Sequence, residues 1–355
     1  MARRRRKKSN LFNYLIIFLL IIGIIYYGKE NDNLKGVFSE IKDQAFTKKI
    51  NIVDQNSKSR PIAVMINNNH AAWPHAGLSD AYITYEIIAE GGITRLMAIF
   101  KDKDTTKVGS VRSSRPYYLD YALENDAIYV HFGYSEDAKN DISSLGVDNI
   151  NGLTDENVFW RDTTLNKARE HTAFTNMEKI KNFSKEKGYD RDVNKPLLLK
   201  YSVDEIDLSK RDDALKADNI FLKYSNYTNS SYEYDSEGKF YKRSMSGVAH
   251  VDAVTGEQYT YKNIIIAPLK NYSYDGYGRQ KLDNIGTFDG YFITNGYSVP
   301  ITFSKKSRTS QTVYKYRDGK EIKFNDGRTF IQITPLGEEI RVLCQIVLVD
   351  SKIDK

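Results

Sequence analysis

The sequence has almost no cysteine: its 355 residues include one, Cys344. A single thiol cannot form an intramolecular disulfide. The folded part must therefore be stabilised by core packing, which a region of roughly 300 residues can provide. Cys344 lies in an apolar run typical of a strand, where it acts as a small hydrophobic residue.

Several sequence motifs that indicate nucleotide binding, hydrolysis or metal binding are also missing. The nucleotide-binding patterns G-x-G-x-x-G and G-x-x-x-x-G-K-[ST] do not occur, nor does the G-x-S-x-G elbow of α/β-hydrolases. No H-E-x-x-H or cysteine-pair pattern is present, so we expect neither a metal nor another cofactor. The chain has 52 basic and 46 acidic residues, and six of the basic residues form the block 3–8. The remainder is balanced, which argues against a surface for nucleic acid.

Long apolar runs are scarce, and the one that stands out lies at residues 11–27. About 20 apolar residues span a membrane as a helix, and clustered Lys and Arg stay in the cytoplasm. We therefore expect a cytoplasmic tail at 1–10, a transmembrane anchor at 11–28 and an extracellular remainder. A cleaved signal peptide and a buried core helix are the alternatives, but no small-x-small cleavage site follows the run.

The rest of the sequence predicts an α+β fold. Residues 29–58 are polar and are interpreted as a stalk. Residues 59–200 mix strand and helix patterns, including a helix with Pro116 in its first turn and Ser113 or Ser114 as its cap. Short strand patterns separated by turn signals dominate residues 201–355, which predicts a mainly antiparallel β part packed against the first.

A hairpin contains the most informative carboxylates. The strand patterns at 81–89 and 94–101 flank the turn formed by Glu90, Gly91 and Gly92. Glu86 stands in the middle of the first, otherwise apolar, strand, where a carboxylate is either paired or raised in pKa. Glu86 and Glu90 are therefore candidate general acids for cleaving a glycosidic bond. The alternative is that Glu86 pairs with an arginine and stabilises the sheet.

Cationic and aromatic residues supply candidate ligand contacts. Arg95, Arg112 and Arg115 offer guanidinium forks that suit carboxylates, phosphates or sugar oxygens. His131 lies in a strand pattern, as either a core histidine or a site residue. The segment 271–278 holds three tyrosines among Gly and Asp, which predicts either a ligand-stacking loop or a hairpin tip.

Five segments together resemble the YerB-like lipoprotein family, a bacterial family of unknown function. They are RPIAVMI at 60–66, YE at 85–86, EGGITR at 90–95, VGSVRSSRP at 108–116 and Asp120, which joins the candidate ligand-binding residues. The resemblance implies a place in the cell envelope. This chain differs in having an apolar anchor where the family has a lipid-modified cysteine.

Two functions follow as expectations. The first is an envelope protein that binds peptidoglycan glycan, with or without cleaving it through Glu86 or Glu90 as acid. The second is a non-catalytic scaffold that binds another envelope protein through its β part and the tyrosine-rich loop. The partners expected are thus the membrane and either peptidoglycan or another envelope protein.

Overall fold

The computed structural model describes residues 49–342 and 345–347 of the chain. The predicted tail, the anchor at 11–28, most of the stalk and Cys344 lie outside these residues. Residues from Ile50 onward belong to one compact unit. Within the part of the chain that is described, no helix is long and apolar enough to cross a membrane.

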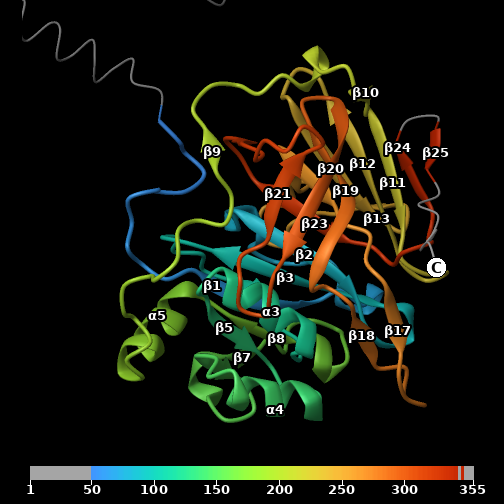
Figure 1. Cartoon of the computed structure of the whole chain (residues 1–355). Coiled ribbons are helices and arrows are strands. Elements are labelled where there is room, and N and C mark those ends of the chain that lie inside the picture. Colours follow the sequence, from blue (N-terminus) through green and yellow to red (C-terminus); the bar gives the residue numbers. More distant parts are fainter. Residues whose placement is uncertain (1–48, 343–344, 348–355) are drawn as a thin grey trace, which may run out of the picture. The chain divides into compact units, whose positions relative to one another are not determined.

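A mixed sheet of eleven strands forms the centre of this unit (Figure 1). Its order is β10-β20-β19-β16-β23-β2-β3-β1-β5-β6, and β21 pairs with β20. The strands are β1 (Ile62–Asn67), β2 (Ile83–Ile88), β3 (Thr94–Phe100), β5 (Ile128–His131), β6 (Asn149–Asn151), β10 (Leu215–Lys216), β16 (Asn263–Ile266), β19 (Gly286–Thr294), β20 (Tyr297–Lys305), β21 (Val313–Tyr316) and β23 (Thr329–Ile333).

Strands from both regions of the sequence share this sheet. β23 lies between β16 and β2 and pairs in parallel with both. The predicted hairpin is confirmed, because β2 and β3 pair antiparallel across the turn at Glu90–Gly92. The α+β prediction is also confirmed, although the sequence boundary near residue 200 coincides with no break in the central sheet.

A second sheet of seven strands has the order β14-β13-β12-β11-β24-β25, with β15 paired to β13. It comes entirely from the later part of the sequence. Its strands are β11 (Asn219–Lys223), β12 (Asn229–Asp235), β13 (Phe240–Met245), β14 (Val248–Ala249), β15 (Thr260–Tyr261), β24 (Ile340–Val342) and β25 (Gln345–Val347).

Short strands and helices complete the described structure. The small sheets contain β4 (Val108–Gly109), β7 (Trp160–Arg161), β8 (Ala173–Thr175), β9 (Tyr201–Ser202), β17 (Asn271–Ser273), β18 (Gln280–Leu282) and β22 (Phe324–Asn325). The α-helices are α3 (Pro116–Glu124), α4 (Glu136–Ser144) and α5 (Met177–Glu186), and the 3-10 helices are η1 (His70–Ala72), η2 (Leu78–Asp80), η3 (Glu90–Gly92), η4 (Glu156–Val158), η5 (Arg169–His171) and η6 (Leu208–Lys210). Pro116 opens α3 as predicted. The serine cap is wrong, because Arg115 occupies the N-cap position and no side chain caps the helix.

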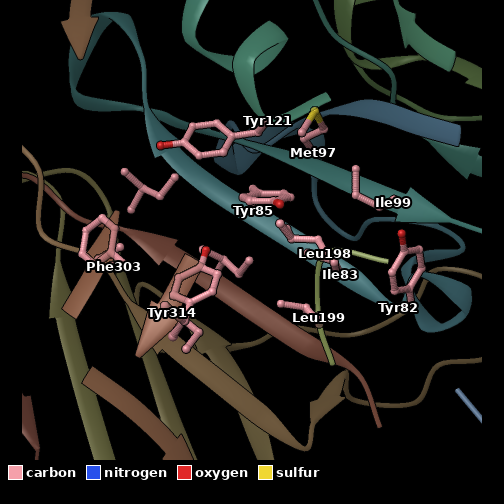
Figure 2. Packing of buried hydrophobic residues seen from close by; sticks show 14 of the residues in the cluster. Tyr82, Ile83, Tyr85, Met97, Ile99, Tyr121, Leu198, Leu199, Phe303 and Tyr314 are labelled. Carbon is pink, nitrogen blue, oxygen red and sulfur yellow. The ribbon is translucent and has the colours of Figure 1, made fainter. Parts of the chain in front are cut away.

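The central sheet is buried on both faces, because alternate side chains of a strand point to opposite sides. On β1, Ala63 and Met65 join one apolar cluster, whereas Val64 and Ile66 join the other. The first cluster packs under α3, where Tyr85 and Tyr121 lie with ring centroids 5.1 Å apart (Figure 2). The second lies against α5 and the second sheet. Polar side chains between the two sheets must therefore find protein partners.

Candidate functional site

Glu86 is completely buried between the two sheets. Its Oε2 lies 2.6 Å from Nη2 of Arg243 on β13, and neither side chain is exposed. Oε1 accepts hydrogen bonds from Asn68 (3.1 Å) and Thr94 (2.7 Å), and Ser230 donates to Oε2 (3.0 Å). Both carboxylate oxygens are thus saturated by protein donors. This is the geometry of a structural ion pair rather than of a group that meets a ligand.

The ion pair continues into a chain of buried histidines. Arg243 has only donors, so its Nη1 donates to Nδ1 of His250 (2.7 Å). Nε2 of His250 then donates to Nδ1 of His75 (2.7 Å), whose Nε2 donates to the carbonyl of Asn67 (2.8 Å). Burial lowers the pKa of His75 to about 3, and burial with the Arg243 charge holds the pKa of His250 well below its usual value. Both rings are therefore neutral at pH 7 and have defined tautomers.

Glu90 lies in a different environment, at the turn between β2 and β3. Gly91 and Gly92 follow it with φ of +67° and +72°, which glycine adopts without steric cost. Arg115 donates from Nε and Nη2 to the two oxygens of Glu90, the second at 2.9 Å, and Nη2 of Arg95 lies 3.5 Å from Oε2. The Glu90 side chain remains 23% exposed.

The charges around Glu90 determine its protonation. Burial raises the pKa of Glu90, but the hydrogen bonds and charge of Arg115, together with Arg95, outweigh burial and lower the pKa below its usual value. The pKa of Arg95 falls to about 10 through burial and the nearby Arg115 charge, which leaves it protonated at pH 7. Glu90 is therefore a carboxylate at neutral pH, and it lacks the raised pKa that a general acid needs.

A hollow of about 350 Å³ opens beside Glu90. Its walls come from the end of β1, the β2–β3 turn, the segment before α3 and the loop between β17 and β18. It is called the arginine pocket here, and its lining residues are Asn67, Asn69, Ala89, Glu90, Ile93, Thr94, Arg95, Arg112, Arg115, Tyr277 and Arg279. Of these described lining residues, four are arginines and one is a carboxylate, so the pocket favours anions.

The four arginines differ in how many of their guanidinium donors already bind protein acceptors. Arg95 donates to the carbonyl of Ser113 and also faces Glu90. Arg115 donates two hydrogen bonds to Glu90. Arg112 has a looser partner, with Nη2 3.5 Å from Glu170, and its side chain is 29% exposed. The Arg279 side chain is 36% exposed, and its ion pair with Asp275 measures 3.2 Å. Arg112 and Arg279 therefore keep the most donor capacity for a ligand.

Asp120 and His131 lie outside the arginine pocket. Asp120 accepts from Arg308 (2.7 Å) and Asn284 (2.9 Å) and lines a separate hollow of about 550 Å³. Burial raises its pKa despite those two partners. The unexposed His131 contacts the carbonyl of Gly133 (2.8 Å), and burial lowers its pKa. The structure thus brings together Glu90 and the three candidate arginines, and places Glu86, Asp120 and His131 elsewhere.

Sequence reasoning missed part of this arrangement. Tyr277 belongs to the tyrosine-rich loop that composition singled out, but no pattern indicated that Arg279 would turn toward the β2–β3 hairpin. The partnership of Glu86 and Arg243 joins positions 157 residues apart. A lone arginine in a later strand gives no local signal of such a contact.

The chain belongs to the DUF3048 family of proteins of unknown function. Its N-terminal domain matches residues 46–190, and its C-terminal domain matches residues 220–331. One relative is the putative lipoprotein YerB of Bacillus subtilis (strain 168), 34% identical over 284 residues that cover 79% of this chain and 82% of the relative. The crystal structure of YerB from Bacillus subtilis matches with a TM-score of 0.69 and 31% identity, over 80% of this chain and 93% of that chain.

These matches confirm the resemblance found in the sequence. A relative described as a lipoprotein also supports the expected location of the folded part in the cell envelope, outside the cytoplasm. They assign no ligand and no reaction.

Proposed function

We propose that this chain is a membrane-anchored envelope protein whose extracellular part binds peptidoglycan through carboxylates held in the arginine pocket. The anchor is the apolar segment 11–28, with the N-terminus in the cytoplasm. The observation that carries the proposal is the set of four guanidinium groups around a hollow that has a single carboxylate in its described lining.

The pocket suits a carboxylate because a guanidinium presents paired N–H donors in one plane, which match the two oxygens of a carboxylate. Peptidoglycan carries such groups on its stem peptides, and on those muramic acid sugars that bear no stem peptide. An envelope protein facing the wall meets these carboxylates at high local density. Arg112 and Arg279 supply the donors, while Glu90 holds Arg95 and Arg115 in place.

The proposal is binding without cleavage. A glycosidase acid must be protonated at neutral pH and must reach the sugar oxygen. Glu86 is enclosed by protein, and Glu90 is ionised between two arginines. The predicted acid role of these residues therefore has no support in the geometry.

A pull-down with purified peptidoglycan tests this function on the full-length chain in a mild detergent. We expect the chain to sediment with the insoluble wall and to release no soluble fragments. Arg112→Ala should weaken binding about tenfold, the effect of losing one charge-assisted contact of about 1.4 kcal/mol. The matched control is Arg317→Ala, an exposed arginine that pairs with Asp289 and does not line the pocket. Equal sedimentation of the Arg112 and Arg317 variants would contradict the proposal.

A second candidate is binding of another envelope protein through the hairpin β17–β18. The observation that favours it is the exposure of Tyr272 (43%), Tyr274 (36%) and Tyr277 (81%), since exposed tyrosines are frequent in protein interfaces. Loss of function in cells on Tyr272→Ala, with wall binding intact, would favour this candidate.

A further inference from the structure

Three aromatic rings form a cluster beside the arginine pocket. The His70 ring contacts Trp73, at a centroid distance of 4.4 Å and tilted by 40°, and Tyr227, at 4.1 Å and nearly parallel. Tyr227 is 41% exposed. These three residues are called the aromatic platform.

The platform is held rigidly by polar contacts beneath it. Nε1 of Trp73 donates to Oδ1 of Asn68 (3.1 Å), and Nδ2 of Asn68 donates to the buried Glu86. Lys167 donates to the carbonyl of Trp73 (2.6 Å). The Trp73 ring is therefore held in place before any ligand arrives, which limits the entropy lost on binding.

The platform and the arginine pocket share the same backbone. Asn69, which lines the pocket, immediately precedes His70. On the other side, a Cβ added to Gly92 in the β2–β3 turn would lie 4.0 Å from Cβ of Tyr227. The hydroxyls of Ser225 (2.6 Å) and Thr228 (2.9 Å) also donate to the carbonyl of Gly92. The platform is therefore a neighbour of the pocket in the fold, although its rings do not belong to the pocket lining.

The platform is uncharged. Burial lowers the pKa of His70, so its ring is neutral at pH 7. Flat aromatic faces offer apolar, polarisable area to a ligand, with a polar edge left for hydrogen bonds. The apolar C–H face of a pyranose ring matches such a surface, whereas a phosphate or a peptide carboxylate gains nothing from it.

We propose that the aromatic platform is a sugar-stacking subsite, which binds a neutral pyranose ring of the wall glycan next to the anion in the arginine pocket. This inference rests on the proposed function and narrows it. The platform selects the glycan strand, and the arginines select the carboxylates of the stem peptides attached to it. Stem peptides alone, or a phosphate polymer, would use only half of the surface.

Fluorescence of the full-length chain can test the platform directly. The chain has two tryptophans, Trp73 and Trp160, so Trp160→Phe leaves Trp73 as a reporter inside the platform. The neutral probe is a tetramer of N-acetylglucosamine, and the anionic probe is a short peptide with two carboxylates. In the Trp160→Phe background, we expect the neutral tetramer to change the emission of Trp73. Tyr227→Ala should weaken its binding about tenfold, because the ring that stacks on the sugar is removed.

Matched variants separate the platform from the pocket. Tyr227→Phe keeps the ring and should bind the tetramer like the parent. Tyr272→Ala removes a similarly exposed tyrosine (43%) away from the platform and should also bind normally. Arg112→Ala should leave the tetramer affinity within about twofold while weakening the peptide about tenfold, as expected for independent sites.

The two proposals fail in different ways. Peptide binding that depends on Arg112, with no tetramer binding at millimolar concentration, overturns the platform and leaves the proposed function standing. Tetramer binding that is unaffected by Tyr227→Ala also overturns the platform. Tetramer binding lost on Tyr227→Ala, with no peptide binding, supports the platform and overturns the arginine pocket as an anion site.

Discussion

Two glutamates four residues apart on one hairpin have opposite surroundings. Glu86 meets an arginine from the other sheet, and protein atoms seal both side chains. Glu90 meets Arg115 and Arg95, which come from nearby segments, and remains partly exposed. Both are ion pairs, yet one joins two sheets and the other borders an open hollow. Access to solvent, rather than the presence of an ion pair, separates a structural carboxylate from one in a binding site.

The buried network around Glu86 also supports the arginine pocket beside Glu90. Through Asn68, Glu86 fixes Trp73, and through Arg243 and the two histidines it is connected to the carbonyl of Asn67. Asn67 and Asn69 line the arginine pocket. The buried Glu86 network thus positions one wall of the arginine pocket.

The largest expected effect is a loss of stability when the buried Glu86–Arg243 ion pair is broken. Arg243→Met leaves the Glu86 carboxylate buried without its cation, which should lower the free energy of unfolding by about 3–5 kcal/mol. Urea unfolding of the full chain at pH 7 measures this change. Arg317→Met, at an exposed pair, should change it by less than about 0.5 kcal/mol. A loss below about 1 kcal/mol for Arg243→Met would show that solvent reaches Glu86.

The second effect is a pH dependence of stability. The unfolded chain takes up protons on His75 and His250 near the usual pKa of 6.5, but folded His75 does so only near pH 3 and folded His250 well below its usual value. Stability from these rings is therefore complete above about pH 6.5 and is lost as the pH falls. These two rings should account for a drop of about 2 kcal/mol in the free energy of unfolding between pH 6 and pH 5, and His75→Asn should remove about half of that contribution. An equal dependence of unfolding free energy on pH in the parent protein and the His75→Asn variant would contradict the neutral state of the buried histidines.

A smaller effect, a gain in ligand affinity rather than a loss of stability, is expected when Glu90 is replaced. Glu90→Gln removes the negative charge that occupies Arg95 and Arg115, so an anionic peptide should bind several-fold tighter. Calorimetric titration of the full chain with the dicarboxylate peptide measures this. Weaker binding by the variant would mean that the positioning of Arg95 and Arg115 by Glu90 outweighs the charge that Glu90 neutralises.

The smallest effect is expected at Asp120, whose partners are Arg308 and Asn284 in a separate hollow. Asp120→Asn should leave peptide affinity within about twofold, because the charge lies outside the arginine pocket. The same titration checks this, with Arg112→Ala as the positive control. A tenfold change would connect the two hollows functionally.

The hairpin was predictable because its residues signal locally. The alternation around Glu86 and the glycines after Glu90 gave the strands, the turn and the pairing, and the three arginines close in sequence did reach the same pocket. Long-range partners were not predictable. Arg243, His75 and His250 join through contacts between segments that are far apart in the sequence, and the parallel placement of β23 beside β2 has no sequence pattern of its own.

Aromatic residues show the same limit. Trp73 and Tyr227 lie 154 positions apart, and each looks like an ordinary loop residue in the sequence. Only the fold reveals that both pack on His70. The tyrosine-rich loop at 271–278 was noticeable by composition, yet its contribution to the arginine pocket includes Arg279, which composition did not indicate.

A crystal structure of the chain with a soluble disaccharide-peptide fragment of peptidoglycan tests the central claim most directly. The account predicts a ligand carboxylate at about 2.7–2.9 Å from the guanidinium nitrogens of Arg112 or Arg279. Ligand bound elsewhere on the molecule, or an empty arginine pocket at saturating fragment concentration, would contradict it.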